Sequence, residues 1–342
     1  MAAQEPVTPD KILQLGMGFW GSKTLLSAVE LGVFTELAKG PADAETLRTR
    51  LHIHARAARD FFDALVALGM LDRQDGRYRN TPASDLFLDR AKPSYVGSLL
   101  EMANARLYGN WASLTEALRT GRPQNEAMQG ETLFDALYQD PERVQLFAKA
   151  MTGVSFGPAM AIAAKFPWAR YKTFADIGTA EGALPVHLAR AQPHLTGVGF
   201  DLPPVRPVFE AFVAKNDLTG RLSFRGGDFL ADPLPAAEVF VLGHILHGLG
   251  LDKKLALLRR VQQALPAGGA VIVYDSIIDD ERRENAFGLL MSLNMLIETS
   301  AGFDYTGADC IGWLRETGFR DARVEPLSGP ASMVVGFKQD GA

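Results

Sequence analysis

Two histidines, His244 and His247, precede a series of acidic residues that strand ends could bring together. An imidazole has an unperturbed pKa of about 6.5, so it can take a proton near neutral pH. A carboxylate on its other ring nitrogen would fix the tautomer, and Asp275 and Asp304 are the candidates for this role. Such a group beside a bound electrophile can deprotonate a phenol or an enol, with His247 as the base.

The same residues permit two other interpretations. His247 could simply cap the loop that follows a strand. The spacing of three also suits a metal pair, with Asp275, Glu298 or Asp304 as a third ligand. No histidine follows residue 247, so a histidine-rich site on this side is impossible. We predict that no metal is bound.

A turn near the middle of the chain predicts a nucleotide site. The stretch from Thr173 to Asp201 has the pattern strand, turn, helix, strand, with Gly178 and Gly182 in the turn. Glycines let the backbone approach a bound molecule closely. Asp201 lies about twenty residues past the turn, where an acid can accept both hydroxyls of a ribose.

The kind of nucleotide follows from what surrounds the turn. It has two glycines instead of the three of a dinucleotide fingerprint, and it lacks the Gly-Lys-Ser/Thr of a triphosphate loop. The acids Asp176 and Glu181 suit a cationic nucleoside better than a pyrophosphate, which points to S-adenosylmethionine. Any other nucleotide-binding strand, turn and helix remains the alternative.

The elements that must position these residues alternate between strand and helix from residue 171 to the end, which predicts one α/β domain. Five strands and a closing antiparallel hairpin (323–327 and 332–337) make a seven-stranded sheet, as is usual for methyl transfer domains. Ligands of such sheets bind at the carboxyl ends of the strands. The residues expected to meet there are Gly178, Asp201, Asp228, the run Gly243 to His247, Asp275 and, on the next helix and loop, Asn294, Glu298 and Asp304.

The N-terminal half is predicted to be mostly helical. Two helices and a hairpin turned at Asp75-Gly76 give residues 43–82 the outline of a winged helix. Arg56 and Arg59 lie among acids, so we do not expect this unit to bind DNA. The apolar residues Met17, Phe19 and Trp20 predict packing against a second chain, with an intrachain core helix as the alternative.

The composition excludes several classes of protein. The chain has 342 residues, 47% of them hydrophobic and 22% charged, as in an ordinary globular protein. A formal net charge of −5 without a basic stripe argues against a nucleic-acid partner. Cys310 is the single cysteine, and no signal peptide or apolar run of membrane length is evident. We therefore expect a cytoplasmic location and no membrane contact.

Several motifs together resemble one family. Residues 8 to 340 resemble the small-molecule O-methyltransferases of the caffeic-acid, acetylserotonin and antibiotic-tailoring type. The matching pieces are Asp176 to Gly182 for the cofactor loop, Asp201 for the ribose, Gly227-Asp-Phe229 for the adenine side, Leu246-His247 for the base, Pro266 to Gly269 for the turn before the fifth strand, and Gly302 to Thr306 for a late acidic motif.

The resemblance implies a winged-helix dimerisation domain at 1–100, a helical linker and substrate pocket at 101–165, and a Rossmann-like class I methyltransferase domain at 166–342. It implies S-adenosylmethionine as methyl donor, S-adenosylhomocysteine as product, a small aromatic substrate and a homodimer through the N-terminal helices. The expected cofactor contacts are Asp176, Gly178, Glu181, Gly182, Asp201, Leu202, Gly227, Asp228, Phe229, Gly243 and His244. Met151, Phe156, Asn294 and Glu298 are expected at the substrate, with ordinary core as the alternative for the first two.

The chain departs from the family pattern at two places. The cofactor loop has Thr179 and Ala180 where glycines are usual, and Ala180 is small enough to be tolerated if its φ is negative. The base motif usually reads Leu-His-Asp/Asn-Trp, whereas here it is Leu246-His-Gly-Leu-Gly250. This altered turn leaves open methylation of carbon and non-methylating chemistry on the same fold. A winged-helix regulator that senses the nucleoside is the alternative from a different class.

Overall fold

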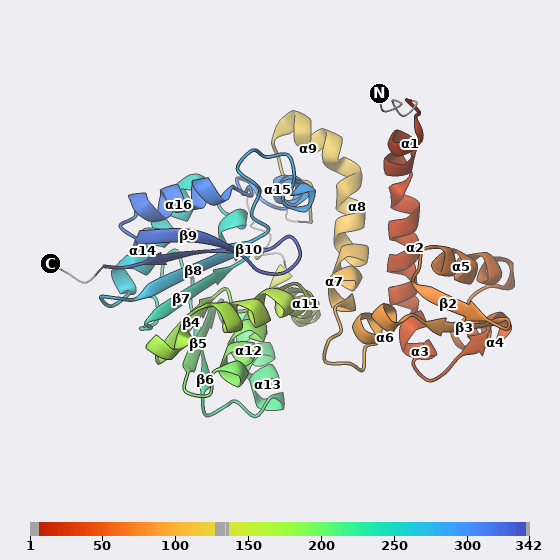
Figure 1. Ribbon diagram of the computed structural model, residues 1–342, viewed down its shortest axis with the longest axis horizontal. Helices are drawn as coiled ribbons and strands as arrows, with labels where there is room; N and C mark the ends of the chain where they lie inside the picture. Colours follow the sequence, from red (N-terminus) through yellow and green to blue (C-terminus); the bar gives the residue numbers. More distant parts are fainter. Residues whose placement is uncertain (1–6, 127–133, 135–136, 340–342) are drawn as a thin grey trace, which may run out of the picture. The chain divides into compact units, whose positions relative to one another are not determined.

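The computed structural model describes residues 7–126, 134 and 137–339, and two compact units, Met1–Leu107 and Tyr108–Ala342, make up the chain (Figure 1). The N-terminal unit is mostly helical. Its elements are α1 (Asp10–Gly16), α2 (Gly18–Leu31), α3 (Val33–Leu37), β1 (Ala42–Asp43), α4 (Ala44–Arg50), α5 (Ala55–Ala67), β2 (Leu71–Gln74), β3 (Arg77–Asn80), α6 (Pro82–Leu88), α7 (Gly97–Met102) and a π-helical turn (Ala103–Leu107).

The predicted winged-helix outline is confirmed by α4, α5 and the β2–β3 hairpin. Asp75 and Gly76 both have positive φ (51° and 73°), as a two-residue hairpin turn requires. The short strand β1 adds to the other side of β3, so the strand order is β1-β3-β2. Phe62 of α5 packs its ring against Tyr78 of β3, and both side chains are buried. This contact ties the hairpin to the helix.

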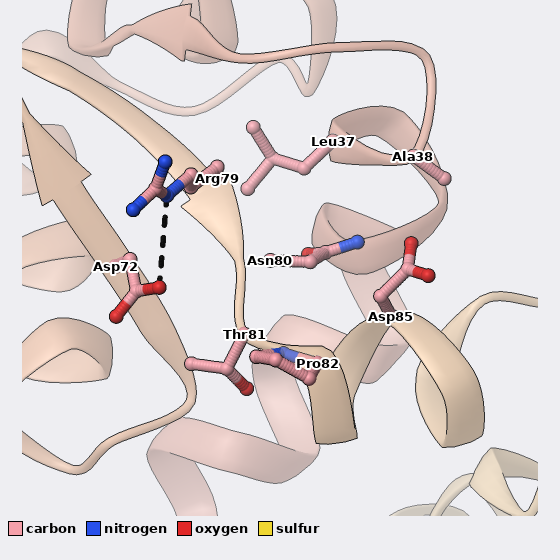
Figure 2. A pocket seen from close by; sticks show the side chains of 8 residues that line it. All are labelled: Leu37, Ala38, Asp72, Arg79, Asn80, Thr81, Pro82 and Asp85. Carbon is pink, nitrogen blue, oxygen red and sulfur yellow. Dashed lines mark ion pairs between the residues drawn. The ribbon is translucent and has the colours of Figure 1, made fainter.

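An open hollow lies at the foot of the hairpin in this unit. Figure 2 shows that its lining comes from α3, the two strands and the start of α6. Asp72 and Arg79 face each other across the hairpin at 3.6 Å, and both are half exposed. Exposed ion pairs contribute little to stability. The eight lining residues include neither a histidine nor a cysteine, so the hollow offers no imidazole and no thiol.

The C-terminal unit is an α/β domain around one sheet. Its strands are β4 (Thr173–Ile177), β5 (Thr196–Asp201), β6 (Leu222–Gly226), β7 (Val239–Gly243), β8 (Ala270–Asp275), β9 (Arg320–Pro326) and β10 (Ser332–Phe337). The order is β6-β5-β4-β7-β8-β10-β9. The first five strands are parallel, and β10 pairs antiparallel with both β8 and β9. The predicted seven strands and closing antiparallel hairpin are confirmed.

Helices cover both faces of this sheet (Figure 1). The helices of the unit are α8 (Tyr108–Asn110), α9 (Leu114–Thr120), α11 (Pro141–Lys165), α12 (Ala183–Ala191), α13 (Arg206–Lys215), α14 (Leu251–Ala264), α15 (Ala286–Glu298) and α16 (Gly307–Glu316). One core lies between the sheet and α11, α12 and α13, and a second lies between the sheet and α14 and α16. All six residues of β8 are buried, as expected for a strand covered on both faces.

Helix α11 is long and apolar enough, by length and composition, to cross a membrane. It contains Pro158 within its length, and its buried positions run from Val144 to Ala163. Ala159, Ile162 and Ala163 belong to the core that α12 and the sheet also form. Packing within the domain therefore accounts for the apolar character of this helix.

The strand order reverses beside β4, because β5 continues on one side of it and β7 lies on the other. Ligands of open α/β sheets bind at such a switch point, outside the carboxyl ends of the strands. The loops after β4 and β7 carry Gly178 and His244, so the fold brings the two predicted motifs to one edge.

Candidate active site

The turn after β4 depends on glycine at Gly178. Its φ is +72°, and a Cβ there would lie 2.2 Å from Cδ1 of Ile245, in the loop after β7. Any other residue would clash in this left-handed conformation. The N–H of Gly178 donates to the carbonyl of Phe200 in β5 at 2.8 Å. The turn is therefore held against both neighbouring strand ends.

Ala180 does not meet the condition of a negative φ under which an alanine would be tolerated here without strain. Its φ is +50°, a left-handed conformation that costs an alanine roughly 1–2 kcal/mol. The backbone N–H of Ala180 donates to Oδ2 of Asp201 at 2.9 Å. This charge-assisted hydrogen bond compensates for the strain and joins the turn to the end of β5.

Asp201 is a buried carboxylate whose second oxygen accepts from the N–H of Leu202 at 2.7 Å. Burial raises the pKa of Asp201 to about 6, although both hydrogen bonds lower it. Burial likewise raises the pKa of Asp176 to about 7, and the charge of Asp201 adds to this. Two desolvated acids at one turn favour a ligand that brings hydroxyl donors or positive charge.

The other predicted cofactor residues have varied surroundings. Glu181 is buried and accepts from Oγ1 of Thr152 at 2.6 Å, and burial raises its pKa. The N–H of Gly227 donates to the carbonyl of Asp201 at 2.9 Å. Asp228 is exposed, and its carboxylate accepts from the N–H of Leu230. Gly182, as N-cap of α12, Leu202 and the half-buried Phe229 complete the predicted set.

The structure adds Tyr138 to this group. Tyr138 is half-buried, and desolvation together with the charge of Asp201 raises the pKa of its phenol well above the usual value. Sequence reasoning missed Tyr138, which lies two residues before the Asp140-Pro141 helix start. An aromatic side chain at a helix start was the only signal.

The loop after β7 places both histidines against Asp275 at the end of β8. His244 Nδ1 lies 3.4 Å from Oδ1 of Asp275, and His247 Nδ1 lies 3.7 Å from the same oxygen. His247 Nδ1 also lies 3.4 Å from Oδ1 of Asp304. Oδ2 of Asp275 accepts from the hydroxyl of Tyr305 at 2.5 Å. The predicted histidines and acids therefore form one cluster.

The charges in this cluster depend on one another. Burial by itself lowers the pKa of His247, but Asp275 and Asp304 outweigh it, so the pKa lies above the usual 6.5. Burial raises the pKa of Asp275, but His247, His244 and Tyr305 bring it below its ordinary value. Burial raises the pKa of Asp304 more than His247 lowers it. The cluster thus favours a protonated imidazole beside an ionised Asp275.

Several buried atoms of the cluster lack a hydrogen bond of good geometry to any described residue: Nε2 of His244, Nδ1 of His247, Oδ1 of Asp275 and both carboxylate oxygens of Asp304. The ligand atoms of His244, His247 and Asp275 lie within 4.8 Å of one another, so this donor set could also hold an ion. Attraction between imidazole and carboxylate accounts for the same distances.

The residues predicted at the substrate lie on α11 and α15. On α11, Phe156 packs edge-to-face on His187 of α12, and Met151 is half-buried next to Thr152. On α15, Asn294 Oδ1 accepts from Nε1 of Trp111 at 2.9 Å. Glu298 Oε1 accepts from the amide of Asn110 at 3.3 Å. These contacts tie the segment around Trp111 to α15.

Helix α11 also connects the glycine turn after β4 with the cluster of His244, His247 and Asp275. Thr152 donates to Glu181 of the glycine turn, and one turn further on Ser155 accepts from the hydroxyl of Tyr274 at 3.2 Å. Tyr274 stands beside Gly243, where a Cβ would meet its ring at 2.1 Å. His244 packs edge-to-face on the same ring. Contacts through α11 and Tyr274 therefore link the glycine turn to the histidine loop.

Comparisons with known proteins agree with this arrangement. The O-methyltransferase domain family matches residues 111–320, and the O-methyltransferase dimerisation domain family matches residues 13–90. The tetracenomycin polyketide synthesis 8-O-methyl transferase TcmO of Streptomyces glaucescens is 48% identical, over 96% of this chain and 97% of its own. The N,N-dimethyltransferase OxyT of Streptomyces rimosus is 39% identical, over 92% of each chain.

Among solved structures, human N-acetylserotonin methyltransferase in complex with S-adenosylmethionine superposes with a TM-score of 0.90. The two chains are 28% identical, and the match covers 99% of this chain and 100% of the other. The chain therefore belongs to the S-adenosylmethionine-dependent O-methyltransferase family and carries that family's dimerisation domain at its N-terminal end.

Proposed function

We propose that this protein methylates a hydroxyl of a small aromatic molecule of the kind made in secondary metabolism, with His247 as the general base. The observation that carries this proposal is the buried cluster of His247, Asp275 and Asp304, which stands at the strand ends beside the glycine turn. The name of TcmO, an 8-O-methyl transferase of polyketide synthesis, supports a hydroxyl as the methyl acceptor.

The residues around the turn fit S-adenosylmethionine. When bound, this cofactor supplies an electrophilic methyl group on a positively charged sulfur. Asp201 already accepts two backbone N–H groups, and a carboxylate has lone pairs left for two ribose hydroxyls. Asp176 and Glu181 offer negative charge for the cation, and Asp228 and Phe229 are proposed on the adenine side. Positive charge would stabilise the ionised forms that burial disfavours.

His247 can then act on the acceptor. Its Nδ1 faces Asp304 and Asp275, which leaves Nε2 as the nitrogen that takes the phenolic proton. The two carboxylates stabilise the imidazolium that forms. Holding the acceptor oxygen at attack distance contributes the larger part of the rate enhancement. We propose that the residues that hold the acceptor are Met151, Phe156, Asn294 and Glu298.

A second candidate function is methylation of an amine. OxyT, at 39% identity, is named an N,N-dimethyltransferase, so closely similar chains differ in acceptor. An aromatic amine near neutral pH needs no strong base, which would suit a weakened His247. Methylation of a ring carbon through the same phenolate uses the same base and is a further outcome of the test below.

The direct test is turnover of labelled S-adenosylmethionine with catechols, hydroxyindoles, polycyclic phenols and aromatic amines. We expect O-methylated phenols as the main product, at a rate that EDTA or phenanthroline leaves unchanged, because we propose no metal at the histidines. Mass spectrometry and NMR locate the methyl group. Amine or carbon products would replace the proposed reaction, loss of activity on chelation would contradict the metal-free site, and cofactor binding without any product would favour the regulator.

We also propose that the homodimer forms through α1 and α2. Large apolar side chains of these helices are exposed in the single chain, including Ile12, Leu15, Phe19 and Trp20. A contiguous patch of this kind marks an interaction surface. The dimerisation domain family, which matches from residue 13, supports the same conclusion.

Replacing Phe19 and Trp20 together by glutamate should convert the dimer to monomer at micromolar concentration, because two charges would have to be buried in the interface. Light scattering measures the mass. Val324→Glu, at another exposed apolar position in the sheet domain, is the control and should remain dimeric. A dimer that survives the double substitution would place the interface elsewhere.

The proposal also covers nucleic-acid binding, the cellular location and the domain bounds. Arg59 and Arg73 both lie near Asp63, which leaves α5 and the hairpin poorly equipped to bind phosphates, so we propose no nucleic-acid partner. The free, buried Cys310 fits a reducing compartment, and we propose the cytoplasm. We retain 1–100, 101–165 and 166–342 as the dimerisation, pocket and cofactor regions.

A further inference from the structure

Lys254 is a fully buried lysine that the proposed mechanism does not use. It lies in the first turn of α14, shortly after the Gly248-Leu249-Gly250 stretch that lacks the usual polar residue and tryptophan. An ammonium group is rarely buried unless it is paired or well hydrogen-bonded, because desolvation disfavours its charge. Its surroundings therefore need an explanation.

The contacts of Lys254 all lead to one segment and the helix after it. Nζ donates to the carbonyl of Phe303 at 2.7 Å. The same atom lies 3.3 Å from the ring centroid of Phe303, 5.1 Å from that of Tyr305 and 5.3 Å from that of Trp313. Aromatic faces attract a cation, so three rings and one carbonyl replace its hydration shell.

The segment that Lys254 holds carries Asp304. Phe303 and Tyr305 flank this acid, whose own N–H donates to Oγ of Ser292 at 3.1 Å. On the other side, the carbonyl of Tyr305 accepts from the N–H of Ile278 at 3.0 Å. The position of the Asp304 carboxylate at His247 is thus set by its neighbours, and the hydrogen bond from Lys254 is the charged one among these contacts.

The charge of Lys254 also acts on the cluster. Burial lowers the pKa of Lys254 to about 8, although Asp275 and Asp304 raise it, so the ammonium is mostly charged at pH 7. Its positive charge lowers the pKa of Asp304 and, as the smallest of several effects, that of His247. The other titratable groups that face this region are His244, Tyr305, Asp309 and Cys310.

We propose that Lys254 is a positioning residue, which holds the Phe303–Tyr305 segment from α14 so that the carboxyl group of Asp304 stays at Nδ1 of His247. Lys254 would position Asp304 in a chain whose turn after His247 lacks the usual polar residue and tryptophan. The inference rests on the proposed function of His247, but the experiments below separate the two.

The test is Lys254→Met, which keeps a long side chain for the aromatic cage and removes the charge and the donor. Lys253→Met, at the exposed neighbouring position of the same helix, is the matched control. We expect kcat to fall roughly 10–100-fold, a part of what the loss of a general base costs, with cofactor affinity unchanged. The acid limb of the pH–rate profile should move to lower pH, because His247 loses the contact with Asp304 that raises its pKa.

The direction in which the acid limb moves distinguishes positioning of Asp304 from a direct electrostatic effect of Lys254 on His247. If Lys254 acted only as a nearby positive charge on His247 itself, its removal would move the limb to higher pH. A double-mutant cycle with Asp304→Asn adds a second criterion, because residues that act through one contact are not additive. We expect Lys254→Met to change kcat less than about threefold when Asp304 is already asparagine.

An unmoved or raised limb, or a full additional loss in the Asp304→Asn background, would overturn the proposal. NMR titration of the His247 imidazole in Lys254→Met gives an answer that does not depend on turnover: a lower pKa supports positioning and an unchanged one refutes it. If His247→Ala keeps full turnover, the proposed role of His247 as general base fails. The NMR titration still decides whether Lys254 positions Asp304 at His247. Should Lys254→Met not fold, Lys254→Gln takes its place in the same measurements.

Discussion

Replacing His247 by alanine should lower turnover roughly 10²–10⁴-fold and leave the affinity for S-adenosylmethionine nearly intact. The reason is that His247 stands in the cluster with Asp275 and Asp304, whereas the proposed cofactor contacts lie mainly at the ends of β4 and β5. Single-turnover kinetics measure the chemical step, and calorimetry measures the affinity. His194→Ala is the matched control, because His194 precedes β5 at the opposite edge of the sheet.

The pH dependence supplies the second half of this prediction. A general base must be neutral, and Asp275 and Asp304 hold the pKa of His247 above 6.5. The rate should therefore rise with pH through a value above 6.5, and the mutant should lose this limb. Because the folded pKa is raised, His247 stabilises the fold fully below pH 6.5, and this stabilisation is lost as the pH rises through the folded value.

A mutant that keeps its turnover would show that the altered turn has displaced the imidazole, or that the acceptor ionises without help. Restoring the usual motif with Gly248→Asp and Leu249→Trp separates these cases. A Cβ at Gly248 would meet nothing within 4 Å, so the first change fits the backbone as it stands. A large gain in O-methylation would indicate a weakened base, and no gain with intact cofactor binding would favour another reaction.

Replacing Asp201 by asparagine should weaken cofactor binding by about 10- to 100-fold, because charge-assisted hydrogen bonds contribute roughly 1.5–3 kcal/mol. Asparagine keeps the shape but presents one acceptor oxygen where the carboxylate has two. Calorimetry with S-adenosylhomocysteine gives the affinity. Asp217→Asn, at an exposed position after α13, is the control. Unchanged affinity in Asp201→Asn would remove Asp201 from the cofactor site.

The affinity of the wild type should also fall as the pH drops below about 7. Burial raises the pKa of Asp176 to about 7 and that of Asp201 to about 6 in the free protein. Bound cation and hydroxyl donors favour the ionised forms, so binding must release protons at lower pH. Without ligand these raised values destabilise the fold as the pH rises from about 4 to 7, and ligand should reverse this. A pH-independent affinity would contradict both assignments.

The sequence by itself determined the class of the fold and the identity of the clustered residues. Fully apolar strands, such as Ala270 to Tyr274, predict a sheet covered on both faces because each face must be buried. The strand-end rule then grouped Gly178, Asp201, His247 and Asp275 at one edge, since parallel strands all end on the same side. The spacing of Asp75-Gly76 predicted the hairpin for a similarly local reason.

Only the tertiary structure decided how these groups interact. Ala180 adopts a positive φ because a hydrogen bond to Asp201, 21 residues away in sequence, compensates for the strain. The proximity of Tyr138 to Asp201 and the engagement of Asn294 by Trp111 depend on long-range packing that no local pattern encodes. Nothing in the sequence distinguishes Lys254 from the adjacent Lys253. The burial of Lys254, and its link to Asp304, follow from the aromatic rings of Phe303, Tyr305 and Trp313, which folding brings to it from another part of the chain.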